Sequence, residues 1–406
     1  MDGDSRKVGP DESIALGPDT IEAVIRTRVR ELIEAVVQEE LQAALGVGRH
    51  ERNEARGGYR HGVRERTLTT SLGPTVLSVP RARLENADGS WQEWSSQVVP
   101  RYQRRSRRVD EAIWGVYLTG ANSRRIKGAL APLLRGAPLG KDAVSRLVAR
   151  MAEDFQQWQM RELGALKIVY TWHDGWYPKV RIGKQRVRVP VLVTLGVTEA
   201  GERVVVDLRL AGQESAAAWR DVLTDLDRRG LGAPHLVIID GNPGLHTAVR
   251  EQWPTVPIQR CTVHKLLNLM AKAPRPLQEE LTEDYRRMVY APSAAEVRRA
   301  RTAFVKKWRG RCSGVVVSLE EAGEELFTFL QFPVTQWKAL RTTNALERIN
   351  EEFRRRTKTQ ASLPSEAAVL LLLFGLLRSG QVKLRKIDGW QHLPKWRAAA
   401  EVKHAA

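Results

Sequence analysis

An α+β fold is predicted by the order of helical and strand-like segments along the 406 residues. Three strand-like runs follow one another between residues 166 and 210, joined by short turns. A helical stretch and a fourth apolar run, residues 236–239, come next. Helical periodicity dominates residues 96–160 and 265–337. Strands grouped between helical regions predict the α+β class.

The N-terminal segment, residues 1–95, is expected to contain one long helix and a small β region. Residues 1–20 are polar and acidic, and we expect them to form a loose tail. An alternating run, TVLSVPRAR, follows a glycine- and arginine-rich segment and predicts a β hairpin or strand pair. Helical spacing over residues 20–45 predicts an amphipathic helix with an apolar face of Ile21, Val24, Ile25, Val29, Leu32, Ile33, Val36 and Leu41.

Residues 96–160 are predicted to be helical, with a glycine-containing turn between two basic segments. The first segment carries Arg101, Arg104, Arg105, Arg107 and Arg108, and the second carries Arg124, Arg125 and Lys127, which precedes Gly128. A helix, a turn and a basic second helix have the outline of a helix-turn-helix, so these side chains are candidate contacts for DNA phosphates. The alternative is a solvated helical face, which is common on basic proteins.

Residues 161–268 carry the strand-like runs. We expect three antiparallel strands at 166–172, 187–197 and 203–210, a helix at 215–229, a fourth strand ending at Asp240, a short helix from Leu245 and an extended segment at 256–260. This order is that of a ribonuclease H-like domain. Glu347 lies too far beyond Asp240 for a structureless loop, so residues 269–336 are predicted to be an all-helical insertion into the core. Residues 337–406 would supply its C-terminal helices and a basic tail.

The composition indicates a polyanionic partner. Lys and Arg outnumber Asp and Glu by 65 to 47, a formal net charge of +18 with a pI of about 10.2. This charge would concentrate nucleic acid near the protein without distinguishing DNA from RNA. Two cysteines exclude a disulfide framework, and the longest apolar run, residues 367–377, is too short to span a bilayer. With no signal segment at the N-terminus, we expect a soluble intracellular protein and no membrane partner.

Three acidic residues are candidate metal ligands. Asp174 and Asp240 each follow a strand-like run at an Asp-Gly step, and Glu347 opens a helical stretch. Carboxylates from two strand ends and one helix can converge and hold hard cations such as Mg²⁺ or Mn²⁺. Each has a plainer explanation, because an Asp-Gly step is often only a turn and Asn344 could form a capping box with Glu347.

Two further glutamates, Glu351 and Glu352, lie near Glu347 in the sequence. Helical spacing favours Glu347 as the ligand, because it lies beside an expected buried stripe of Leu346, Ile349 and Phe353. The same helix ends in a basic run, Arg354, Arg355, Arg356 and Lys358. These cations either contact the DNA backbone or are solvated side chains that favour a helix C-terminus.

Cys261 and His264 form a Cys-x-x-His pair, but a structural zinc site needs four ligands and the sequence offers no second pair. A local role is therefore favoured, with Cys261 packed as a small hydrophobe and His264 near the carboxylates or a phosphate. We also expect Asn344 to support the site. The aromatic side chains around the first aspartate could stack on an unpaired base or fill the core; they are Trp172, Trp176 and Tyr177.

Five stretches of this chain, in order, resemble the mutator-type family of bacterial DDE transposases encoded by insertion sequences. They are RHGVRERTLTTSLGPTVLSVPRAR, VVPRYQRRSRRVDEAIWGVYLTGANSRRI, DGWYPKVR, IDGNPGLHTAVREQWPTVPIQRCTVHKLLN and LRTTNALERINEEFRRRTK. Position by position, the resemblance implies a catalytic, metal-binding triad of Asp174, Asp240 and Glu347, and it includes the Cys-x-x-His pair. His173 before the first aspartate and ASLP after the last basic run depart from the family pattern.

The resemblance implies a DNA transposase that binds two Mg²⁺ or Mn²⁺ ions. One ion would activate the attacking oxygen and the other would stabilise the leaving 3′-oxygen. The implied partners are double-stranded DNA, both terminal inverted repeats and target DNA, and further copies of the chain in a homodimer or higher oligomer. Residues upstream of 160 would read the repeats, and the setting would be the nucleoid of a prokaryotic cytoplasm. The alternatives are a catalytically silent DNA-binding protein and a ribonuclease H-like nuclease without joining activity.

Overall fold

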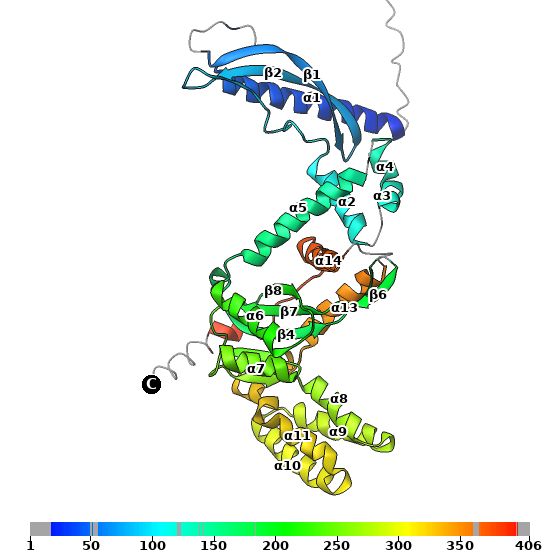
Figure 1. The fold of residues 1–406 in the computed structure, drawn as a ribbon, viewed down its shortest axis with the longest axis vertical. Helices are drawn as coiled ribbons and strands as arrows, with labels where there is room; N and C mark the ends of the chain where they lie inside the picture. The colour runs from blue at the N-terminus through cyan, green and yellow to red at the C-terminus, as the bar shows by residue number, and fades with distance from the viewer. Residues whose placement is uncertain are drawn as a thin grey trace, which may run out of the picture. The chain divides into compact units, whose positions relative to one another are not determined.

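The computed structural model describes residues 18–48, 51, 56–119, 123–137, 139, 141–182, 184–359, 365–394 and 396 (Figure 1). It divides into an N-terminal unit, Met1–Tyr117 with Asn122–Leu147, and a C-terminal unit, Leu118–Ala121 with Val148–Ala406. Helices and a mixed sheet are both present among the described residues, which confirms the α+β class. The expected tail up to residue 17 and the ASLP segment, residues 361–364, lie outside the described part of the chain.

In the N-terminal unit, one helix lies along a long β hairpin. The helix α1 spans Pro18–Leu45, β1 (Gly58–Thr70) pairs antiparallel with β2 (Gly73–Glu85), and β3 (Trp91–Glu93) extends the sheet beside β2. The hairpin is longer than predicted because much of the glycine- and arginine-rich segment is itself β1. Gly58 lies so close to β2 that a Cβ there would come within 2.1 Å of the Arg83 carbonyl oxygen.

The helix α1 has two apolar faces, and the hairpin covers one of them. Val37, Leu41 and Leu45 recur every four residues and are buried against the hairpin. The predicted apolar face is therefore wrong for most of its members: Leu41 is buried and Val29 and Ile33 are partly buried, but Ile21, Val24, Ile25, Leu32 and Val36 are exposed. The hairpin contacts the other side of the helix.

Four helices follow the hairpin. They are α2 (Arg107–Leu118), α3 (Ser123–Ala129), α4 (Ala131–Leu134) and α5 (Lys141–Met160). The helices α2 and α3 correspond to the two members of the predicted helix-turn-helix, whose turn residues 120–122 lie outside the described residues. Because α3 has only 7 residues, the helix-turn-helix stays a prediction.

The C-terminal unit is built on a mixed five-stranded sheet of order β10-β9-β4-β7-β8. The strand β9 pairs parallel with β4 and β10, whereas β7 pairs antiparallel with β4 and β8. In chain order the strands are β4 (Ile168–Trp176), β7 (Val191–Thr198), β8 (Arg203–Leu210), β9 (Leu236–Ile239) and β10 (Ile258–Arg260).

Both faces of this sheet are covered. On one face, α6 (Ala216–Arg228) and α7 (Pro243–Gln252) bury Trp219 and Leu245 against Val206 and Val237 of the strands. On the other face, Trp172 donates a hydrogen bond to the Thr342 carbonyl oxygen, 3.1 Å away. The segment that precedes Glu347 is therefore attached to the centre of the sheet.

Two predicted strands have different bounds in the structure. The strand β4 continues through Asp174 to Trp176, because β7 keeps pairing with it. The strand predicted at 187–197 is two strands: β6 (Gln185–Arg188) forms a separate hairpin with β5 (Lys179–Ile182), and β7 begins only after Pro190. Proline has no N–H to donate to a sheet, which explains the break.

The region between β10 and Glu347 is helical, as predicted, and contains no strand among its described residues. It comprises α8 (Thr262–Lys272), α9 (Gln278–Val289), α10 (Ala294–Arg311), α11 (Ser313–Ala322), short 3-10 turns and α12 (Trp337–Leu340), and it leads to α13 (Asn344–Thr359) and α14 (Ala367–Arg378). No helix in the described ranges combines the length and apolar character that crossing a membrane requires.

Asn242 caps α7 directly after β9. Its side-chain oxygen accepts hydrogen bonds from the backbone N–H groups of Gly244, at 2.8 Å, and Leu245, at 3.1 Å. Pro243 occupies the first turn, where its missing N–H has no cost. The cap starts α7 two residues before the predicted Leu245 and ends the loop that contains Asp240.

Replacing Asn242 by alanine should lower the free energy of unfolding of the C-terminal unit by about 1 kcal/mol, because two amide donors lose their acceptor. Urea unfolding followed by circular dichroism measures this change. Asn242→Ser keeps an acceptor and should retain most of the stability. Equal losses in the two variants would contradict the capping role.

Candidate active site

Asp174 lies inside β4, partly buried, rather than in a turn after it. Its backbone pairs with Val193 of β7, so the turn interpretation of this Asp-Gly step is wrong. The side-chain amide of Asn350 donates a 2.9 Å hydrogen bond to its Oδ2 atom. Asn350 belongs to α13, so this bond ties the helix that carries Glu347 to the strand that carries Asp174.

Asp240 follows the neighbouring strand. The last residue of β9, Ile239, pairs in parallel with His173, which places Asp240 beside Asp174. The backbone N–H of Asn242 donates to Asp240 Oδ1 at 2.9 Å. Gly241 has a φ of +102°, and a Cβ there would come within 2.7 Å of the Arg260 guanidinium, so this loop requires glycine.

Glu347 lies in the first turn of α13, but it does not form the capping box that was the alternative explanation for this residue. The Thr343 carbonyl oxygen accepts the backbone N–H groups of Leu346 and Glu347, so Asn344 is already inside the helix. The Glu347 carboxylate instead accepts a 3.3 Å hydrogen bond from the Thr343 hydroxyl. Asn344 is exposed, and within the described residues nothing links its side chain to the carboxylates.

Among the residues that the structure describes, the other two glutamates of α13 do not contact the candidate site. Glu351 is exposed, and Glu352 pairs with Arg355 on the next turn. The predicted buried stripe of Leu346, Ile349 and Phe353 is confirmed. With this stripe packed inward, Glu347 is the glutamate of α13 whose charge reaches Asp174.

Negative charge is concentrated around Asp174. Burial raises the pKa of its carboxyl most, and the charges of Asp240, Glu214 and Glu347 raise it further, to about 7, although His264 opposes them. Three chain segments far apart in sequence therefore bring Asp174, Asp240 and Glu347 within electrostatic reach of one another. A site of this kind gains stability from any cation that it can bind.

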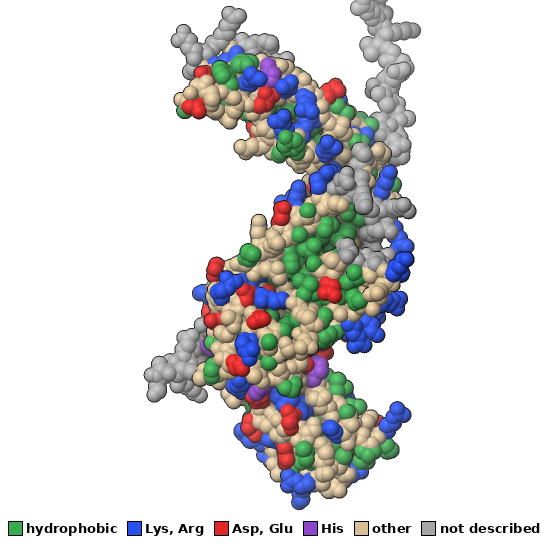
Figure 2. Space-filling model, in the orientation of Figure 1, with side chains coloured by type: hydrophobic (Ala, Val, Ile, Leu, Met, Phe, Trp, Pro, Cys, Tyr) green, Lys and Arg blue, Asp and Glu red, His purple; other side chains and the backbone are tan. Residues whose placement is uncertain are grey.

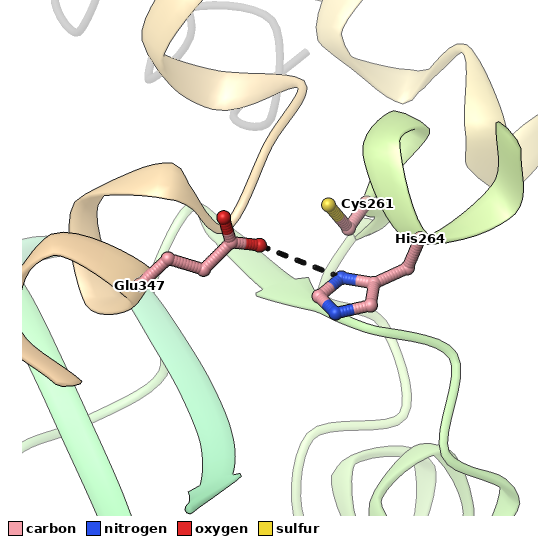
Figure 3. Close-up of side chains that lie close together, drawn as sticks. All are labelled: Cys261, His264 and Glu347. Atoms are coloured by element: carbon pink, nitrogen blue, oxygen red, sulfur yellow. Dashed lines mark ion pairs between the residues drawn. The ribbon is translucent and has the colours of Figure 1, made fainter. Parts of the chain in front are cut away.

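Cys261, His264 and Glu347 form a compact cluster at the start of α8 and α13 (Figure 3). The His264 Nδ1 atom lies 3.9 Å from Glu347 Oε1. The Thr343 hydroxyl is 3.3 Å from Cys261 Sγ, His264 Nδ1 and Glu347 Oε1 alike, and the Thr343 backbone N–H also points to the sulfur at 3.3 Å. Thr343 therefore joins the Cys-x-x-His pair to the acidic helix.

The pKa values of His264 and Cys261 shift in opposite directions, each toward its charged form. A hydrogen bond to Cys261 raises the pKa of His264 to about 9, against the effect of burial, and the charges of Asp240 and Glu347 add to this. Burial alone would raise the pKa of the Cys261 thiol, but hydrogen bonds from His264 and Thr343 hold it below its ordinary value. Cys261 is fully buried, as predicted, but it is more than a small hydrophobe.

The aromatic side chains near Asp174 belong mainly to the core. Trp172 and Trp176 are buried, and Trp176 packs against Phe353 of α13 with ring centroids 5.7 Å apart. Tyr177 is exposed, and its hydroxyl donates to Glu214 at 2.8 Å. His173 is fully buried, which lowers its pKa to about 3 and keeps it neutral between two threonine hydroxyls.

Three residues of the site were not predicted from the sequence. Glu214 precedes α6, and a Cβ on Gly175 would come within 2.3 Å of its carboxylate, so Gly175 leaves room for a fourth acid. Thr343 and Asn350 hold Glu347 and Asp174 in place. Thr343 could have been noticed because it precedes the helix at a capping position. Glu214 has no comparable sequence signal.

The predicted DNA-contacting arginines before α2 are not equivalent. Arg105 is partly buried and pairs with Asp110 at 2.7 Å, so its charge is neutralised within the fold. Arg107 pairs with Glu111 at 3.1 Å on the surface. The predicted contacts with exposed side chains are Arg101, Arg104, Arg108, Arg125 and Lys127, and the side chain of Arg124 lies outside the described residues.

The basic end of α13 is similarly mixed. Arg354 and Lys358 are exposed, Arg356 is partly buried, and Arg355 pairs with Glu352. Their positions on α13 place them in the C-terminal unit, after Glu347 on the same helix. No DNA contact follows from exposure alone, so these residues remain predicted contacts.

The residues present suit a divalent cation in two ways. Carboxylate oxygens are the ligands that Mg²⁺ and Mn²⁺ prefer, and Asp174, Asp240 and Glu347 supply them beside the buried, unpartnered amide oxygen of Asn350. Cys261, His264 and Glu347 are the described set whose potential ligand atoms all lie within 4.8 Å of one another, and sulfur and nitrogen are ligands of zinc. Glu347 thus adds a third potential ligand to the Cys-x-x-His pair, one fewer than a structural zinc site needs.

Known transposases are similar to this protein along most of the chain. The sequence model described as "Transposase, Mutator family" matches residues 11–385. The transposase for insertion sequence element ISRM5 of Rhizobium meliloti (strain 1021) is 33% identical, over 88% of this chain and 87% of that protein. The transposase for IS406 of Burkholderia multivorans is 32% identical over 86% of this chain and 88% of that protein. The transposase for IS256 in transposon Tn4001 of Staphylococcus aureus is 28% identical over 88% of this chain and 89% of that protein.

The solved structures that match include a chain of the Drosophila P element transposase strand transfer complex. It covers 70% of this chain and 82% of its own, with 11% sequence identity and a TM-score of 0.29. A similarity this low supports no argument about the fold.

Asp174→Asn should stabilise the metal-free protein at pH 8 more than at pH 5. A pKa raised to about 7 means that the folded protein keeps a proton that the unfolded chain loses near pH 3.8, so stability falls as pH rises between these values. We expect a melting temperature gain on the order of several degrees at pH 8, measured by differential scanning fluorimetry in EDTA.

The exposed Asp221 of α6 provides the control, since Asp221→Asn should leave the melting temperature unchanged at both pH values. Adding Mg²⁺ or Mn²⁺ at pH 8 should stabilise wild-type protein and not Asp174→Asn. A loss of stability in Asp174→Asn at pH 8 would contradict the charge repulsion.

Proposed function

This chain belongs to the Mutator family of transposases, and we propose that it cuts and joins DNA at the ends of an insertion sequence, using Asp174, Asp240 and Glu347. The named relatives are transposases for insertion sequence elements and align with most of this chain and of their own length. The expected substrates are terminal inverted repeats and target DNA.

The catalytic core we propose is ribonuclease H-like. Three consecutive antiparallel strands, followed by two parallel strands added on the other side of the first, support this assignment. The first strand carries Asp174, the fourth ends before Asp240, and the helices α8 to α11 separate that strand from Glu347. The two ends of the helical insertion are joined by a 2.9 Å hydrogen bond from the Thr262 N–H to the Arg341 carbonyl oxygen.

The observation that carries the proposal is that β9 and α13 bring Asp240 and Glu347 close to Asp174. Its carboxylate is surrounded by Asp240, Glu347 and Glu214, and a protein tolerates such crowding where a cation offsets it. Two Mg²⁺ or Mn²⁺ ions held there would activate the attacking oxygen and stabilise the charge on the leaving 3′-oxygen.

The surrounding residues would position the acids and supply positive charge. Thr343 fixes the start of α13 and so aims Glu347, while Asn350 orients the carboxylate of Asp174. His264, protonated at neutral pH, places a positive charge next to Glu347 and Asp240, where a DNA phosphate would be bound. Water would attack first to nick the DNA, and the freed 3′-hydroxyl would attack the second phosphodiester.

Self-association through α1 is part of the proposal. The outer face of α1, formed by Ile21, Ile25, Leu32 and Val36, is exposed and lies on one side of the helix. A second copy packed against this face would cover these residues.

Single substitutions Asp174→Asn, Asp240→Asn and Glu347→Gln should each reduce metal-dependent cleavage of a repeat-containing duplex by roughly 100-fold or more, because each removes a negative ligand. Binding of the uncleaved duplex should be nearly unchanged. Glu351→Gln and Glu352→Gln are matched controls on the same helix and should retain cleavage. Gel analysis of end-labelled DNA measures both steps.

A pre-nicked end with a 3′-hydroxyl tests joining separately from hydrolysis. Wild-type protein should attach it covalently to a supercoiled plasmid. If wild-type protein nicks its ends and never joins the pre-nicked substrate, a nuclease is the better description. If it binds ends and does neither reaction, it is a catalytically silent DNA-binding protein.

Neutralising Arg104 and Arg108 together should weaken DNA binding and flatten its salt dependence by about 0.9 in log-log slope for each phosphate that is no longer neutralised. Arg105→Gln should instead lower the melting temperature, because it breaks the partly buried pair with Asp110. Fluorescence anisotropy at several salt concentrations and thermal unfolding measure the two effects. An unchanged slope in the Arg104 and Arg108 variant would mean that these side chains are only solvated.

Leu32→Glu should shift the protein from dimer to monomer in sedimentation equilibrium, because it places a charge in the apolar contact. Val63→Glu, at another exposed apolar position in the N-terminal unit, is the control. A dimer unaffected by Leu32→Glu would exclude this face as the contact.

A further inference from the structure

The hairpin of β5 and β6 carries an unusual concentration of positive charge. Lys179 lies directly opposite Arg188, and Arg181 lies opposite Arg186. Side chains at alternate positions of paired strands share one face, so these four cations are on the same side of the hairpin. All four are exposed, whereas Val180, on the opposite face, is buried.

Like charges directly opposite each other destabilise a sheet. Within the described part of the chain, Lys179, Arg186 and Arg188 have no carboxylate partner that would offset this repulsion. The hairpin thus holds charges of one sign close together, as the acidic site does with the opposite sign. An anion with regularly spaced charges would remove the penalty.

The hairpin is also close to the candidate active site along the chain and in space. Only a short turn separates it from β4, the strand of Asp174, and α13, the helix of Glu347, packs against both β4 and β5. Figure 2 shows Lys and Arg side chains gathered over the region where Figure 1 places β6 and α13. Exposed Arg354 and Lys358 of α13 belong to the same unit.

We propose that the β5–β6 hairpin is a phosphate-backbone clamp that holds duplex DNA next to the acidic site. This inference rests on the proposed function for the role of the bound DNA, and on the hairpin alone for the binding. Two facing pairs of cations suit neighbouring backbone phosphates, and none of these side chains needs to contact a base. The clamp would therefore bind DNA irrespective of sequence and hold it for cleavage.

The repulsion within the hairpin makes it possible to distinguish cations that bind DNA from cations that stabilise the fold. Removing two of the cations should make the free protein more stable and its DNA complex weaker. An arginine that stabilises the fold would give the opposite change in stability. The double variant Arg186→Gln with Arg188→Gln takes one member from each repelling pair.

The test uses the full chain, a random-sequence duplex and EDTA, so that no cleavage occurs. The double variant should melt about 1–4 °C higher than wild type, and the log-log salt slope of binding should fall by about 0.9 for each phosphate that the hairpin no longer neutralises, that is by about one to two. Arg220→Gln is the matched control, because Arg220 of α6 is an exposed arginine paired with Glu251 at 2.7 Å. It should not raise the melting temperature or change the slope.

An unchanged salt slope in the double variant would overturn the clamp, and so would a lower melting temperature. Wild-type protein that binds DNA through the hairpin but never cleaves repeat-containing DNA would leave the clamp intact and count against the proposed function. Wild-type protein that cleaves, together with an unaltered slope in the double variant, would support the proposed function and exclude the clamp.

Discussion

Burial of carboxylates carried by two neighbouring strands, together with their mutual repulsion, is the constraint on which the C-terminal unit depends. Parallel pairing of β4 with β9 puts Asp240 beside Asp174, and Thr343 holds the start of α13 so that Glu347 joins them. Burying acids together opposes folding, which is why the pKa of Asp174 rises to about 7. Strain of this kind persists at functional sites because the surrounding structure holds it in place.

The helical region between β10 and α13 matters because its two ends are hydrogen-bonded to each other. Thr262 at the start of α8 bonds through both its N–H and its hydroxyl to the Arg341 carbonyl oxygen, just before α13. The chain can therefore leave the sheet after β10 and return to it without disturbing the acidic cluster. This junction also contains Cys261, His264 and Thr343, so the Cys-x-x-His pair is placed at the point where the insertion meets the site.

Much of this arrangement could be predicted from the sequence. The α+β class, the strand at 203–210, the helix at 215–229, the helical region after Cys261 and the buried stripe beside Glu347 depend on local periodicity, which is legible in a single chain. The outer face of α1 was misassigned because periodicity identifies an apolar face without saying what covers it. The end of β4 was misplaced because an Asp-Gly step favours a turn only when no neighbouring strand continues the pairing.

The sequence by itself determined which residues could do acid, metal or phosphate chemistry, since that depends on side-chain type and on spacing within one element. Only the tertiary structure decided which of them meet. Glu214 joins the acids because Gly175 leaves room for its carboxylate, and Arg105 is neutralised by Asp110 while Lys179 and Arg188 face each other across the hairpin. Such pairings join positions on different elements, and the free energy of a charge depends on the neighbours that folding brings to it.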